Sequence, residues 1–111
     1  MKKDIIQYSD FQKLDLRIGE VKSAVPVEKS TKLLALMVDF GEDYGEVEIL
    51  SGIAQWYTPE DLVGNKFVFL ANLEPRAMMG KTSNGMIIAA DAEKPVLMKI
   101  ENDIANGAAI R

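Results

Sequence analysis

The chain has 111 residues, of which 48% are hydrophobic and 27% are charged, a composition typical of one globular domain. It contains neither cysteine nor histidine, which excludes disulfides, metal sites built on sulfur or imidazole, and catalysis by either side chain. Composition alone leaves open catalysis by a carboxylate pair, a lysine base or a purely electrostatic site. We predict a single domain over residues 1–111 that is not an enzyme, with no catalytic residue, no metal and no cofactor.

The beginning of the chain carries two lysines but lacks the apolar run of a signal peptide. No apolar stretch approaches the roughly 20 residues that cross a bilayer as a helix. We expect a cytoplasmic protein with no membrane partner.

The formal net charge of −4 is unevenly distributed along the chain. Residues 33–65 contain seven acidic residues and no lysine or arginine, whereas residues 13–32 and 66–81 are each net positive. Folding could gather these charges into one basic face and one acidic face, although the charge pattern alone favours the plainer interpretation. That interpretation is that these are ordinary solvated surface charges.

In chain order, the first expected element is about one helical turn over residues 8–14. A long strand follows over residues 16–27, and its apolar positions change from even to odd numbers along its length. Gly19 lies near this change, so we predict a β-bulge there that bends the strand around a barrel.

The next two segments predict a hairpin. Leu34, Leu36, Val38 and Phe40 alternate with residues of the other face, which is typical of a half-buried strand. After a turn rich in glycine and acidic residues, the alternation resumes over residues 46–49.

A short helix is predicted over residues 58–64, with Thr58 as its cap, Pro59 in its first turn and Gly64 at its end. An all-apolar strand over residues 67–71 follows, then a loop over residues 72–84 and a last strand over residues 86–90. We expect the aromatic side chains Trp56, Tyr57 and Phe67 to pack in the core.

This order of elements predicts an all-β fold, a five-stranded OB-fold barrel with short helices. Residues 91–111 form a C-terminal extension whose apolar side chains exceed what the barrel needs. They must pack either on the outside of the barrel or against a second copy of the chain, and we favour a homodimer with this extension in its interface.

Several sequence blocks occur in a fixed order and together resemble one known family. The blocks are Phe11 to Gly19, Lys32-Leu33-Leu34, Val38 to Gly41, Ser51-Gly52-Ile53, Tyr57 to Gly64, Ala71 to Arg76, Met78-Met79-Gly80, Ser83 to Met86 and Asn106 to Arg111. The chain is similar to the stand-alone structure-specific tRNA-binding proteins and to the C-terminal tRNA-binding domain of methionyl-tRNA synthetases.

The resemblance implies a homodimeric OB-fold protein that binds tRNA by shape rather than by sequence, with an aminoacyl-tRNA synthetase as a possible partner. We expect a basic rim for the phosphates, helped by polar and adaptable side chains near an OB-fold binding face. The candidate tRNA-binding residues are Arg17, Lys32, Arg76, Lys81, Ser83, Asn84 and Met86.

Each candidate also has a purely structural interpretation. Arg17 has carboxylates within two or three residues for an ion pair, Lys32 is an ordinary surface lysine, and Met86 fits a core position. We expect Asn72 to bond backbone groups at a strand end rather than a ligand.

Two functions compete with tRNA binding. The first is a peptide-binding, export-chaperone-like role, which suits an acidic protein on the same fold. The second is a docking module that holds a synthetase or another protein and never touches RNA.

Overall fold

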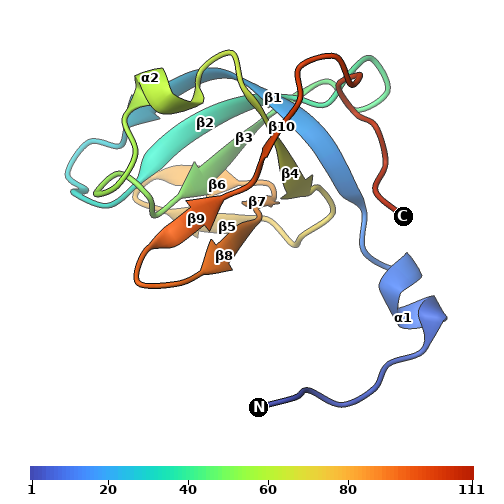
Figure 1. Cartoon of the computed structure of the whole chain (residues 1–111). Helices are drawn as coiled ribbons and strands as arrows, with labels where there is room; N and C mark the ends of the chain where they lie inside the picture. The colour runs from blue at the N-terminus through green and yellow to red at the C-terminus, as the bar shows by residue number, and fades with distance from the viewer.

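The computed structural model describes all 111 residues and shows a nearly closed, OB-like barrel (Figure 1). Neighbouring strands in the main sheet are antiparallel, in the order β10-β4-β1-β2-β3, and β7 pairs with β4. The predicted five-stranded barrel is confirmed. Its strands are β1 (Leu16–Pro26), β2 (Leu34–Asp39), β3 (Glu46–Ser51), β4 (Lys66–Leu70) and β7 (Met86–Ile87).

Two short helices, two small hairpins and the two-residue strand β10, which pairs with β4, complete the chain. The predicted loop over residues 72–84 instead contains a hairpin, and the predicted strand over residues 86–90 is divided at Ile88, beyond which the chain leaves the barrel. These elements are α1 (Tyr8–Gln12), α2 (Pro59–Leu62), β5 (Arg76–Met78), β6 (Lys81–Ser83), β8 (Ala89–Asp91), β9 (Pro95–Leu97) and β10 (Lys99–Ile100).

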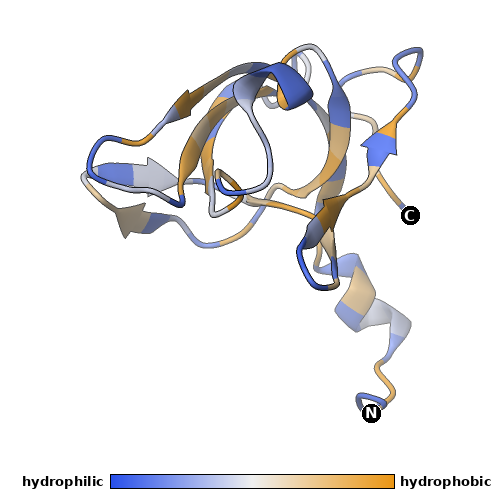
Figure 2. Ribbon diagram, turned by 60° about the vertical axis from the view of Figure 1, so that its left-hand side comes forward, coloured by the Kyte–Doolittle hydropathy of each residue, from blue (hydrophilic) through white to orange (hydrophobic).

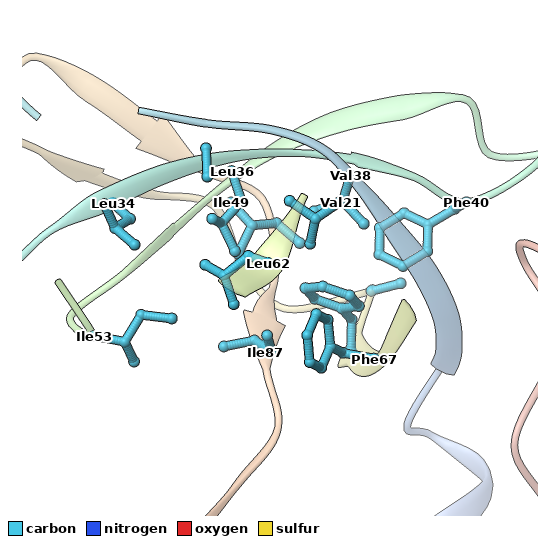
Figure 3. Close-up of a cluster of buried hydrophobic side chains, with 13 residues drawn as sticks. Val21, Leu34, Leu36, Val38, Phe40, Ile49, Ile53, Leu62, Phe67 and Ile87 are labelled. Carbon is cyan, nitrogen blue, oxygen red and sulfur yellow. The ribbon is translucent and has the colours of Figure 1, made fainter. Parts of the chain in front are cut away.

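The barrel interior is filled by the side chains that the alternation in β2 predicted. Leu34, Leu36, Val38 and Phe40 are all fully buried, and they meet residues of the other barrel strands and of α2 (Figure 3). Phe40 and Phe69 pack edge to face with ring centroids 5.5 Å apart.

The bulge in β1 lies three residues beyond the predicted position. The register of β1 against β2 shifts between Val21 and Ser23, not at Gly19. Gly19 has another role, because an added Cβ would meet the side chains of Phe40 and Phe69 within 3 Å. The glycine therefore makes room for the aromatic core, and Lys22 is the residue left out of register.

The predicted helix over residues 58–64 is confirmed as α2. Thr58 and Asp61 form a capping box, and Pro59 begins the helix. Gly64 follows with a φ of +83°, a conformation that favours glycine.

The aromatic side chains before α2 divide between core and surface. Tyr57 packs against the core, and its hydroxyl donates to the Pro95 carbonyl and accepts from the Leu97 amide. Phe67 is buried, but the prediction for Trp56 is wrong, because 43% of its surface is exposed.

The C-terminal extension packs on the barrel through backbone hydrogen bonds. The amide of Ile18 donates to the Ala108 carbonyl, and the amides of Gly107 and Ile110 donate back to β1. Ile18 is consequently buried beneath this segment rather than in the main core.

The N-terminal residues make no such packing contact. In Figures 1 and 2 the segment before β1, with α1, projects away from the barrel, and α1 has no buried residue. None of the helices has the length and apolar character needed to cross a membrane.

Candidate nucleic-acid interface

The hairpin β5–β6 lies against the outer face of the sheet, on the opposite side from the core. Met78 of this hairpin and Leu33, which precedes β2, pack on a small cluster formed by Val27, Ala35 and Leu50. The loop that carries Lys32 is therefore close to the hairpin, and Figure 1 shows both at the same end of the barrel.

Two of the predicted site residues close the gap between β3 and β7. Ser83 is only 5% exposed; its hydroxyl accepts the Leu50 amide at 3.0 Å and donates to the Gly85 carbonyl at 3.1 Å. Both the backbone amide and the side-chain amide of Asn84 donate to the Glu48 carbonyl. Ser83 thus holds the hairpin onto the sheet, and only part of Asn84 remains available to a ligand.

The cations near this hairpin differ in whether their side chains already have a partner within the chain. Lys32 and Arg76 are exposed and their side chains make no hydrogen bond or ion pair within the chain. Lys81 is also exposed, but its ammonium lies 3.5 Å from the Glu48 carboxylate. Such a surface pair is weak, so Lys81 can exchange this partner for a phosphate.

A pocket of about 160 Å³ opens at the base of the hairpin, next to Arg76. Met86 is 46% exposed beside it, which places this side chain outside the core. Leu73 and Glu74 also line the pocket, and sequence reasoning missed both because they lie in an irregular segment without periodicity.

Arg17 is separated from these residues and is bound at the other end of β1. Its Nε donates to Asp15 at 2.6 Å, its Nη1 donates to the Gly107 carbonyl at 3.1 Å, and its guanidinium lies 5.2 Å from the Tyr44 ring centroid. The structural interpretation of this arginine, an ion pair with Asp15, is confirmed. Arg17 therefore fastens the C-terminal segment instead of joining the hairpin cations.

The contacts among Asp15, Arg17 and Tyr44 shift the pKa values of all three side chains. Burial tends to raise the pKa of Asp15, but hydrogen bonds from Arg17 and Tyr44, with the Arg17 charge, lower it below its ordinary value. The bond to Asp15 raises the pKa of Arg17 and also that of the Tyr44 hydroxyl. Asp15 is therefore a stable anion that holds Arg17 in place.

A larger cavity of about 300 Å³ lies beside Arg17, between the β2–β3 loop and the C-terminal segment. The side-chain amide of Asn106 there donates to both Glu20 and Asp39, and its buried oxygen has no partner. The chain holds no group of three or more acidic side chains suited to a metal ion.

Asn72 acts as expected at a strand end. Its side chain accepts from the Asp15 amide at 2.9 Å and donates to the Lys13 carbonyl at 2.8 Å. It therefore joins the start of β1 to the end of β4.

A family model described as "Putative tRNA binding domain" matches residues 16–109, nearly the whole chain and every barrel strand. The chain belongs to this tRNA-binding domain family. The resemblance found in the sequence blocks is thereby confirmed.

Family members of known sequence and structure resemble this chain over almost its full length. A methionine–tRNA ligase of Archaeoglobus fulgidus is 48% identical over 106 residues, covering 95% of this chain and 16% of the ligase. A MetRS related protein from Pyrococcus horikoshii is 35% identical, with a TM-score of 0.92 over 98% of this chain and 100% of that chain. The chaperone CsaA from Bacillus anthracis is 31% identical, with a TM-score of 0.84 over 97% and 100%.

These coverages define how far the likeness extends. The chain spans about one sixth of the length of the ligases it matches, whereas it matches the two solved structures from end to end. The shared part is the tRNA-binding domain.

Proposed function

We propose that this protein binds tRNA without catalysing a reaction on it, and that the binding surface is the face around the β5–β6 hairpin. The observation that supports the proposal is that Leu33, next to Lys32, and Met78 of the hairpin pack on the same small cluster, which brings the segments of Lys32, Arg76 and Lys81 together. Cations of this kind supply most of the affinity of proteins for the phosphate backbone. Asn84 follows the hairpin and Met86 is exposed on barrel strand β7, and both can contact sugars and bases.

The interface is small and weakly basic. Only Lys32 and Arg76 are unpaired, and the acidic strand β3 lies beside Lys81. We expect two or three phosphate contacts for each subunit, and hence a shallow salt dependence with a slope of about −1.5 to −2.5. Such an interface selects RNA by the positions of its phosphates, that is, by shape.

We also propose that the protein acts as a homodimer. Apolar side chains of the N-terminal segment and of the C-terminal extension are exposed on each subunit; these are Ile5, Ile6, Tyr8, Val96, Met98 and Ile104. Two copies of a small phosphate-binding face on one body raise the total affinity, because the second contact forms at a high effective concentration.

The kinship with methionine–tRNA ligases supports a further element of the proposal, namely that the protein presents tRNA to a methionyl-tRNA synthetase in the cytoplasm. The chain itself corresponds to about one sixth of such a ligase. In this arrangement the protein binds the tRNA, and the synthetase carries out the aminoacylation reaction.

The test is a titration of purified protein with total tRNA at two salt concentrations. The double variant Lys32→Glu/Arg76→Glu is expected to weaken binding at least tenfold, because it turns two phosphate contacts into repulsions. The control is Lys22→Glu, which reverses a partly exposed cation of β1 outside the hairpin face and outside the segments proposed for the dimer, and is expected to bind like the wild type. Equal affinities for both variants would contradict the proposed surface.

Peptide binding is a second candidate, favoured by the likeness to the CsaA chaperone and by exposed apolar side chains such as Met79. An unfolded peptide that binds with little salt dependence and is not displaced by tRNA would support this alternative. If unlabelled tRNA displaces labelled tRNA and the peptide does not, the result supports tRNA binding.

A further inference from the structure

The pocket at the base of the hairpin has apolar walls and a charged mouth. Leu73 and Met86 are 43% and 46% exposed at its sides, while Leu50 and Met78 lie deeper and are more buried. The methionine thioether is adaptable and makes favourable contacts with aromatic rings, often at the ring edge, and the leucine side chains add apolar surface. The walls therefore suit a planar, uncharged group.

The volume limits what such a group can be. At about 160 Å³ the pocket is well below the range of roughly 300–1,000 Å³ that is usual for drug-sized ligands. A single heterocyclic ring system fits this space, whereas a base pair does not. A base that enters this pocket must therefore have left its stack and its pairing partner.

The charged residues at the mouth of the pocket indicate which group would be attached to a ring bound inside it. Arg76 lines the pocket and makes no ion pair within the chain, so its guanidinium is free to bind an anion in bidentate fashion. Glu74 also lines the pocket and repels an anion, which leaves the Arg76 side as the place for a phosphate. An apolar slot beside one free arginine matches the chemistry of a nucleotide.

We propose that this pocket takes one unpaired nucleobase of the bound RNA, with its phosphate on Arg76. The proposal rests on the proposed function and adds to it. Recognition then includes a single-stranded nucleotide, at a loop or a free end, in addition to the phosphates that report the shape of the RNA.

The floor of the pocket is rigid, which favours such a role. Ser83 and Gly85 line it, and the Ser83 hydroxyl is bonded to both the Leu50 amide and the Gly85 carbonyl. A Cβ on Gly85 would lie 2.7 Å from the Leu70 carbonyl oxygen, so the chain at this point is held close to β4. A preformed slot of this kind binds a base without first ordering a loop.

The test compares three probes by fluorescence anisotropy: an octamer of adenosine, an abasic octamer with the same sugar–phosphate chain, and a blunt RNA duplex. We expect the octaadenosine to bind at least five times more tightly than the abasic strand, although both carry the same charge. The duplex is expected to bind no better than the abasic strand. Equal affinity for the abasic and adenosine strands would overturn the proposal.

A matched pair of variants assigns the effect to the pocket. Met86→Ala removes a wall of the pocket and is expected to weaken octaadenosine binding about three- to tenfold, the range of a sulfur–aromatic contact. Met79→Ala removes an equally exposed methionine that lies in the adjacent turn and does not line the pocket, and it is expected to change nothing. Equal losses in both variants would also overturn the proposal.

Total tRNA separates the failure of this proposal from the failure of the proposed function. If wild-type protein binds tRNA but Met86→Ala binds octaadenosine as well as Met79→Ala does, the base pocket is refuted and tRNA binding stands. If wild-type protein binds neither tRNA nor octaadenosine, both proposals are refuted. Melting curves check that both variants remain folded.

Discussion

The carboxylate of Asp15 joins three parts of the chain that are distant in sequence. Its two oxygens accept hydrogen bonds from Arg17 on β1 and from Tyr44 in the β2–β3 loop, at 2.6 and 2.7 Å. Arg17 continues the connection to the Gly107 carbonyl in the C-terminal segment. Because charged hydrogen bonds are stronger than neutral ones, loss of the Asp15 charge affects all three parts.

Replacement of Asp15 by asparagine is expected to reduce the free energy of unfolding by about 1 kcal/mol at pH 7, since these charged hydrogen bonds are partly exposed. For a domain of this size the Tm falls by roughly 4–8 °C. The folded-state pKa of Asp15 lies below its ordinary value of 3.8. The stabilisation is therefore fully present above about pH 4 to 5, and is lost as the pH falls through the folded-state pKa.

Thermal melts between pH 7 and pH 2 measure this difference. The gap in Tm between wild type and Asp15→Asn is expected to close in strong acid. Asp91→Asn serves as the control, because the Asp91 carboxylate is exposed and makes no ion pair or hydrogen bond. A gap that stays constant down to pH 2 would show that the Asp15 charge contributes nothing.

At the scale of elements, the β5–β6 hairpin depends on one buried hydroxyl. Ser83→Ala leaves the Leu50 amide and the Gly85 carbonyl without their shared partner, and an unpaired buried group costs about 1–3 kcal/mol. We expect the Tm to fall by about 10 °C. We also expect weaker tRNA binding, because the hairpin that carries Arg76 and Lys81 is no longer fixed on the sheet.

Thr82 provides the matched control for this variant. It is the neighbouring residue on the same strand, is exposed, and makes no side-chain hydrogen bond. Thr82→Ala is expected to melt close to the wild type. Hydrogen exchange gives a second measurement, since only Ser83→Ala should speed the exchange of the Leu50 amide; unchanged exchange would contradict the anchoring role.

The sequence predicted regular elements well and the hairpin poorly, for a physical reason. The large apolar residues of β2 alternate because they fill the barrel interior, and the α2 boundary carries its own cap, so both left a pattern. The strands β5 and β6 have three residues each, too few for a period to emerge. Their turn places Met79 and Gly80 at positive φ, and a methionine at such a position gives no turn signal.

The candidate site could also be predicted only in part from the sequence. Arg76 and Lys81 were predicted from their positions beside a loop that borders the proposed binding face, and the structure places them on one hairpin, whose Met78 packs on the same cluster as Leu33. Arg17 fitted the same criterion of charge, but its partner Tyr44 and the carbonyl of Gly107 are distant in sequence. Only the tertiary structure could reveal that it is held there.

At the scale of the whole molecule, the separation of charge is partial. The hairpin end carries Lys32, Arg76 and Lys81, but Glu48 and Glu74 lie among them. A single subunit therefore presents a modest field to RNA, and two subunits are needed for a strong one. The proposed dimer is thus linked to the proposed function, and the exposed N-terminal segment is the place to test it.

Ile5 and Ile6 are 100% and 62% exposed on a segment that makes no packing contact with its own barrel. Two apolar side chains held in water in this way are best explained by burial against a second copy, as in a two-fold dimer. The variant Ile5→Asp/Ile6→Asp is expected to sediment as a monomer with an unchanged fold, and to bind tRNA at least tenfold more weakly. Val63→Asp places a charge on an equally apolar exposed site beside α2 and should remain dimeric. A double variant that still sediments as a dimer would exclude the N-terminal segment from the interface and leave the C-terminal extension as the surface to examine.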